Sequence, residues 1–90
     1  MNNTETREIL DKHVRQWEQR GYEELSRLTT AKHIETFEQT GAGGTFYQIE
    51  IRFFWDVSSG GAIRVFGAID DGGITAYVPL CSDTLVDPNP

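Results

Sequence analysis

The stretch that decides the fold is FYQIEIRFFWDV, at residues 46–57. Every second side chain in it is apolar, and the side chains between them are mixed in character. Successive side chains of a β-strand point to opposite faces of a sheet, so this period of two predicts a long central strand with one buried face. The apolar set is Tyr47, Ile49, Ile51, Phe53, Trp55 and Val57.

The same alternation recurs twice further along the chain. It places core positions first at Ile63, Val65, Gly67 and Ile69, and then at Ile74, Ala76, Val78 and Leu80. A type I′ turn at Asp71-Gly72 brings every core residue opposite another core residue, because turn length fixes register. We therefore predict a β-hairpin. Its expected pairs are Ile69 with Ile74, Val65 with Val78 and Ile63 with Leu80.

The connection between the first two of these strands has two readings. Pairing core residues with core residues requires an odd-length loop around Ser58-Ser59-Gly60-Gly61. A three-residue loop ending at Gly60 in a bulge satisfies this condition, and so does a five-residue loop that runs through Ala62. Both registers stay open at this point.

Residues 33–40 are expected to form an edge strand before the central one. The following Gly41-Ala42-Gly43-Gly44 suits a hairpin loop, and the central strand needs a partner on that side. Ile34 and Phe37 have opposite parity, so the strand is an edge strand or is bulged. A helix that starts from a Thr30 cap is the alternative.

At the other end of the chain, we expect Pro79 to end the pairing of the last strand or to mark the opposite edge of the sheet. Leu85 to Pro90 are expected to form a loose tail. The domain itself is placed at residues 1–86, with 87–90 as the C-terminal tail.

The first 30 residues follow a helical period instead. Apolar side chains recur every three or four residues, which predicts an amphipathic helix from about Thr4 to Arg20, ended by Gly21. Tyr22 to Leu28 predict a short second turn of helix. The helical stripe consists of Ile9, Leu10, Val14 and Trp17.

These elements predict an α+β domain in which an N-terminal amphipathic helix packs on one face of a three- to four-stranded antiparallel β-meander. Ninety residues are too few for a second core of useful size.

Composition excludes several classes of protein. The chain carries 14 acidic residues against 8 lysines and arginines, a formal charge of -6, which disfavours nucleic acid as a partner. The charge is -2 over residues 1–40 and -4 over residues 41–90. A membrane span needs about 18 apolar residues in a row, and no such run occurs. The single cysteine, Cys81, cannot form an internal disulfide, so a cytoplasmic location is expected.

Residues able to do chemistry are present but do not form a recognised motif. The loop Gly41 to Thr45 precedes a strand rather than the helix that a phosphate loop requires. Cys81, Asp83, His13 and His33 show no local signature of a nucleophilic site, and the two histidines lack the short ligand spacing of a metal site. Asp70-Asp71 is an incomplete calcium ligand set. We therefore expect no catalytic, cofactor-binding or metal-binding residues, and an enzyme is the less favoured class.

The face of the sheet opposite the core is the candidate functional surface. One helix covers only one side of such a sheet, and aromatic and arginine side chains are enriched in interface cores. Arginine stems that merely shelter scattered aromatics are the alternative interpretation. The candidate partner-binding residues are Arg52, Phe54, Arg64, Phe66 and Tyr77.

The arrangement on this face depends on the loop at residues 58–61. With a five-residue loop, Phe54, Phe66 and Tyr77 form one row across the sheet. With a three-residue loop, Arg52 lies opposite Phe66 and Arg64 opposite Phe54, which suits cation–π stacking.

Three hypotheses for the function follow. The first is a noncatalytic protein-interaction module, with a homodimer through this face as its main version. The second is an acidic inhibitor or immunity-type protein that binds a basic partner, and such binding weakens with salt. The third is a small ligand-binding protein or enzyme, which needs a concave pocket with convergent polar groups.

Four segments of the sequence stand out, mostly as strand and turn motifs: Tyr22-Glu23-Glu24-Leu25, Tyr47-Gln48-Ile49-Glu50, Phe54-Trp55-Asp56 and Ala68-Ile69-Asp70-Asp71-Gly72-Gly73. With them the chain resembles small bacterial proteins of unknown function that share a helix and an antiparallel meander. The resemblance covers about residues 22–86 and implies the fold and a bacterial origin, but no activity.

Overall fold

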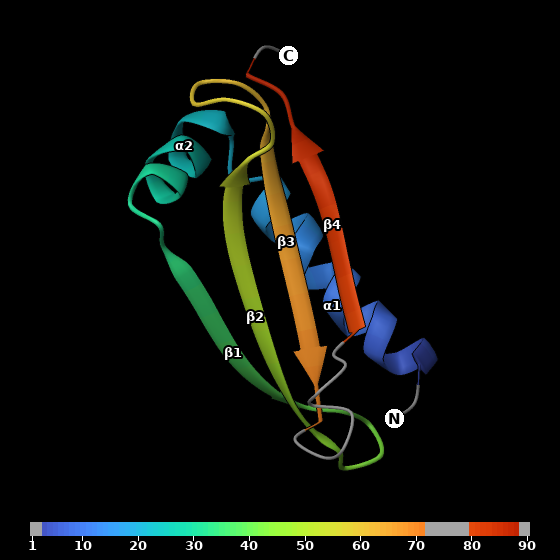
Figure 1. Ribbon diagram of the computed structural model, residues 1–90. Coiled ribbons are helices and arrows are strands. Elements are labelled where there is room, and N and C mark those ends of the chain that lie inside the picture. The colour runs from blue at the N-terminus through green and yellow to red at the C-terminus, as the bar shows by residue number, and fades with distance from the viewer. Residues whose placement is uncertain (1–2, 72–79, 89–90) are drawn as a thin grey trace.

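Two helices pack on a four-stranded antiparallel sheet in the computed structural model, which describes residues 3–71 and 80–88 (Figure 1). The strands lie in chain order, β1-β2-β3-β4, and each pairs antiparallel with the next. The predicted α+β fold, with the N-terminal helix on the sheet, is confirmed. The elements are α1 (Asn3–Glu18), α2 (Tyr22–Thr30), β1 (Ile34–Thr40), β2 (Phe46–Trp55), β3 (Ile63–Asp70) and β4 (Leu80–Val86).

Both helices cover the same face of the sheet. Helix α1 passes behind β3 and β4 in Figure 1 and packs against them, while α2 packs against β2 and β3. Side chains from both helices and from alternate positions of β2 and β3 form one core, as the two sequence periods predicted. The buried apolar residues are Ile9, Leu10, Val14, Trp17, Leu25, Tyr47, Ile49, Ile51, Phe53, Ile63, Val65 and Ile69.

The end of α2 is a Schellman motif. The backbone N–H of His33 donates to the Leu28 carbonyl (3.0 Å), and the N–H of Lys32 donates to the Thr29 carbonyl (3.1 Å). This pattern requires a left-handed residue after the helix, and Lys32 occupies that position with φ 56°. Glycine is the usual residue there, so a lysine is an unfavourable choice for the backbone.

Strand β1 is the edge strand predicted for residues 33–40, and the helical alternative is wrong. Phe37 packs against the core, whereas Ile34 points to the other face and is 45% exposed. The glycine loop that follows is a tight hairpin loop, in which the Gly41 N–H donates to the Thr45 carbonyl (2.8 Å). Gly44 provides the positive φ (87°) that closes the loop.

The β2–β3 hairpin takes the register of the three-residue loop. Arg52 lies opposite Phe66 and Phe54 opposite Arg64, and Gly60 has a φ of 87°. Because β2 ends at Trp55, Val57 lies in the loop and is 91% exposed. Its assignment to the core face is therefore wrong.

The predicted pairing of β3 with residues 74–80 is wrong. Strand β3 pairs instead with Leu80–Val86: Ile69 lies opposite Leu80, and Ile63 lies opposite Val86 rather than Leu80. Leu85 and Val86 thus belong to the sheet and not to a loose tail. The proposed Asp71-Gly72 turn lies partly outside the described residues, and residues 74–79, including Pro79, lie wholly outside them.

The observed partner strand is displaced by six residues from the predicted one. Because six is an even number, the same alternate positions face the core in both pairings. Residues 80, 82, 84 and 86 face the core side, as 74, 76 and 78 would have done. Two of them are polar and contact α1: Ser82 Oγ donates to Asp11 Oδ1 (2.9 Å), and Thr84 Oγ1 donates to Glu18 Oε2 (2.7 Å). These long-range hydrogen bonds make a half-polar strand acceptable on the helix side.

Candidate functional site

The candidate site is the face of the sheet turned away from the helices, here called the open face. Every strand places alternate residues on it, and no described helix packs over it. Its central residues are Ile34 and Thr36 of β1, Glu50, Arg52 and Phe54 of β2, Arg64, Phe66 and Ala68 of β3, and Cys81, Asp83 and Leu85 of β4.

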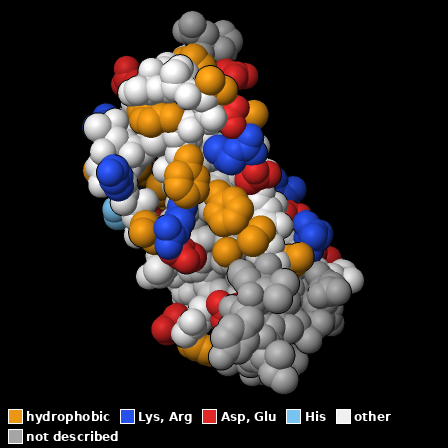
Figure 2. All heavy atoms as spheres, in the orientation of Figure 1, with side chains coloured by type: hydrophobic (Ala, Val, Ile, Leu, Met, Phe, Trp, Pro, Cys, Tyr) orange, Lys and Arg blue, Asp and Glu red, His pale blue; other side chains and the backbone are white. Residues whose placement is uncertain are grey.

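Apolar side chains gather at the middle of the open face. Phe54 and Leu85 are each 46% exposed, and Ile34 is exposed to a similar degree. The Phe54 and Phe66 rings meet edge to face, with centroids 6.5 Å apart. Figure 2 shows hydrophobic side chains grouped here, with charged side chains of both signs around them. We call Ile34, Phe54, Phe66 and Leu85 the apolar cluster.

The two arginines alternate with the apolar cluster because of the register. One row across the sheet runs Ile34, Arg52, Phe66, Asp83, and the next runs Phe54, Arg64, Leu85. Apolar side chains therefore neighbour one another diagonally, and each arginine stem lies between two of them. Cross-strand and diagonal neighbours on one face are close enough to interact.

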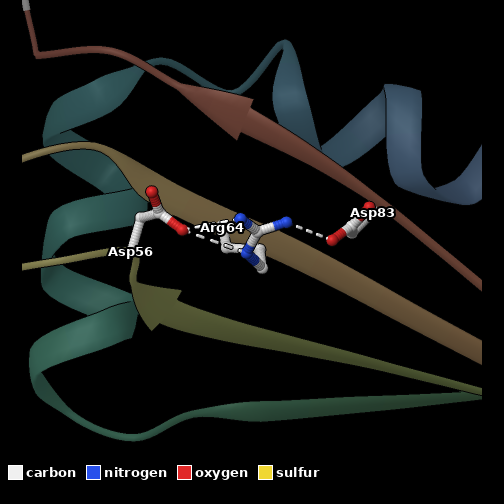
Figure 3. Close-up of polar contacts among 3 residues, drawn as sticks. All are labelled: Asp56, Arg64 and Asp83. Atoms are coloured by element: carbon white, nitrogen blue, oxygen red, sulfur yellow. Dashed lines mark hydrogen bonds and ion pairs between the residues drawn. The ribbon is translucent and has the colours of Figure 1, made fainter.

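Arg64 is held between two carboxylates from neighbouring parts of the sheet (Figure 3). Its Nη2 lies 2.6 Å from Asp56 Oδ1, which also accepts from Nε (3.2 Å), and its Nη1 forms an ion pair with Asp83. Hydrogen bonding to Asp56, and then to Asp83, raises the pKa of the Arg64 guanidinium above its ordinary value. The guanidinium therefore stays charged and is oriented by two carboxylates, one just after β2 and one on β4.

Arg52 has a carboxylate partner as well. Its Nη2 lies 2.7 Å from Oε1 of Glu50 on the same strand. The stacking of Arg52 on Phe66, which the three-residue register predicted, is thus replaced by an ion pair. The close guanidinium–ring contact that the structure does show joins Arg20 and Trp17 (4.3 Å), away from the open face.

Four of the five candidate residues come together on the open face: Arg52, Phe54, Arg64 and Phe66. Tyr77 lies outside the described residues. Sequence reasoning did not include Ile34 or Leu85 in the cluster. The parity of Ile34 would have placed it there, but Leu85 was assigned to the tail.

The other candidate residues for chemistry remain apart. His13 lies against Phe37 (ring centroids 4.9 Å apart), and His33 contacts Glu35 (Nε2 to Oε1, 2.5 Å). Cys81 is exposed on β4. Across residues 3–71 and 80–88, no group of three His, Cys, Asp or Glu side chains is placed to hold a metal ion. Over the same ranges no helix has the length and apolar character to cross a bilayer.

Comparison with known proteins gives no relative for this chain: no family model, curated protein or solved structure matches it. The resemblance to small bacterial proteins therefore stays a prediction.

Proposed function

We propose that the protein is a noncatalytic interaction module that pairs with a second copy of itself through the open face. The observation that carries the proposal is the apolar cluster, which lies exposed on the side of the sheet that neither helix covers. An apolar centre ringed by charged groups is the usual anatomy of a protein–protein interface.

The charges on the open face favour a second copy as the partner. The face carries arginines and carboxylates in alternation, so a twofold arrangement can place arginines of one copy against carboxylates of the other. Arg64 is already oriented by Asp56 and Asp83, so it loses little conformational freedom when a partner binds.

The size of the face sets the expected affinity. Four strands about 4.8 Å apart, with seven residues rising about 3.3 Å each, cover a rectangle of roughly 19 by 23 Å. Two such flat rectangles together bury roughly 900 Å², and protruding side chains add to this area. The total is therefore close to the small end of specific interfaces, about 1,200 Å². A weak dimer, with a dissociation constant on the order of micromolar, is expected.

Analytical ultracentrifugation over a micromolar-to-millimolar concentration series tests the proposal. Wild type is expected to shift from monomer to dimer, and Phe66→Asp to stay monomeric, because it places a charge at the centre of the cluster. Val57→Asp is the matched control: the same charge enters a loop residue that is 91% exposed. A reducing agent keeps the exposed Cys81 from cross-linking two copies.

Two results would reject self-association. One is a wild-type protein that stays monomeric throughout the series, and the other is a Phe66→Asp dimer as strong as wild type. Leu85→Asp repeats the test from another strand, and circular dichroism of each variant establishes that it is folded.

A basic partner is the second candidate, favoured by the acidic side chains at one end of the open face. A depression of about 680 Å³ beside the apolar cluster is lined in part by Glu38, Glu50 and Asp70. Binding of an oligolysine peptide is expected to weaken steeply between low and high salt. Binding that is insensitive to salt, or undetectable at low salt, would exclude this second function.

A further inference from the structure

A crevice lies where α2 ends and β2 runs past the start of β1. Its volume is about 330 Å³, within the range of small-ligand pockets, about 300–1,000 Å³. Aromatic side chains and cations line it together. The lining residues are Thr29, Lys32, His33, Ile34, Arg52, Phe53, Phe54 and Trp55.

The backbone of β2 is open toward this crevice. The pairing of β1 with β2 begins at Ile34 opposite Arg52, so the last three residues of β2 extend beyond it. The Asp56 N–H donates to the Ala62 carbonyl of the β3 side, and backbone groups alternate between neighbours along an antiparallel strand. The N–H and C=O of Trp55 therefore point to the β1 side, where the described residues supply no strand partner.

The residue that would have continued β1 is engaged elsewhere. The N–H of His33 caps α2 by donating to Leu28. The chain consequently turns away before it reaches the level of Trp55, so no described strand residue lies opposite the Trp55 N–H. A backbone donor of this kind suits an anion.

Lys32 supplies a positive charge to the same crevice. Its backbone is left-handed at a position where glycine is the usual residue, and the residue lines the crevice. Arg52 and His33 add two groups able to carry positive charge, and their carboxylate partners, Glu50 and Glu35, lie outside the lining. In a chain with a net charge of -6, the described lining thus contains cationic groups and no carboxylate.

We propose that the crevice binds a small planar aromatic carboxylate. The ligand ring packs against Trp55, whose side chain lies on the helix side of β2, and its carboxylate accepts hydrogen bonds from the Lys32 ammonium and the Trp55 backbone N–H. The ring supplies apolar contact area, and the charge-assisted hydrogen bonds select the acid over neutral analogues. The crevice shares Ile34, Arg52 and Phe54 with the open face, but the proposal does not rest on self-association, because Thr29, Lys32 and Trp55 lie off that face.

Titration with 1-naphthoate, followed by the ¹H–¹⁵N spectrum, tests the site. We expect shifts concentrated at Lys32, the Trp55 backbone and the Trp55 indole, with binding in the millimolar range or tighter. Neutral 1-naphthamide is expected to bind at least about fivefold more weakly, since it lacks the charge. The cationic 1-naphthylmethylamine is expected to produce no shifts at these residues.

Lys32→Gly is the decisive variant, because glycine suits the left-handed backbone and the protein stays folded. It is expected to weaken naphthoate binding about tenfold. Lys12→Ala, which removes an exposed lysine from α1, is the matched control with no expected change.

Absence of shifts at millimolar naphthoate would overturn the proposal, and so would equal affinity for the acid and the amide, or a Lys32→Gly protein that binds like wild type. Leu85→Asp, the dimer variant on β4 whose residue is not part of the crevice lining, is expected to bind naphthoate normally. A failure of the dimer proposal and a failure of this one are therefore separate results.

Discussion

Gly67 of β3 lies so close to Leu10 of α1 that a Cβ added to Gly67 would stand 2.8 Å from the Leu10 Cδ1 atom. The same added Cβ would lie 2.8 Å from Cγ2 of Val14. The helix thus approaches the backbone of the sheet at a position where only glycine leaves enough room. Leu10 is fully buried and Val14 nearly so, which leaves neither side chain free space into which to move.

Gly67→Ala is therefore expected to destabilise the protein. Overpacking of a tight core typically lowers the free energy of unfolding by about 1–3 kcal/mol, and urea denaturation measures the loss. Gly43→Ala is the control, because nothing lies within 4 Å of a Cβ built there. Equal stability of the two variants would contradict the close approach of α1 to β3.

Tyr47→Phe tests the hydrogen bond that joins β2 to α1. The buried Tyr47 hydroxyl donates to Glu5 Oε1 over 2.9 Å, so its removal is expected to lower the free energy of unfolding by about 1 kcal/mol. Because the two residues interact, the losses in Tyr47→Phe and Glu5→Ala are expected to add to more than the loss in the double variant. Strict additivity in urea denaturation would show that the bond contributes nothing.

Lys32→Gly is expected to raise the stability of the folded protein. A left-handed conformation costs a residue with a Cβ about 1–2 kcal/mol, and glycine avoids most of that cost. Thermal denaturation measures the gain. Lys32→Ala keeps the Cβ while it removes the ammonium, so it is expected to give no gain; a similar rise in both variants would assign the effect to charge instead.

Arg64→Gln separates folding from association. Both ion pairs of Arg64 are at the surface, so the midpoint of denaturation is expected to change little. Self-association is expected to weaken about tenfold or more, because Asp56 and Asp83 then face the partner without their shared cation. Arg27→Gln changes an exposed arginine on α2 and serves as the control.

Much of the sheet could be predicted because its apolar positions alternate. The period of two identified the buried side chains of β2 and β3, and core-to-core matching reduced the β2–β3 hairpin to two registers, one of which is observed. The edge position of β1 followed from the opposite parity of Ile34 and Phe37. These inferences needed only local sequence.

The location of β4 and the crevice could not be predicted for physical reasons. Alternation identifies a face but cannot distinguish a strand from one displaced by an even number of residues. The polar residues on the core side of β4 are explained only by their hydrogen bonds to Asp11 and Glu18. The crevice depends on where β1 stops relative to β2, which the cap of α2 decides.

Because the helices cover only one side of the sheet, neighbouring residues of a strand have different roles: one packs in the core and the next lies on the open face. In β2, Ile51 and Phe53 are buried in the core, whereas Arg52 and Phe54, which alternate with them, lie on the open face. A library covering every substitution in this strand, scored separately for protein abundance and for self-association, should divide into odd and even positions. Binding through this surface can therefore be retuned one substitution at a time with little effect on abundance.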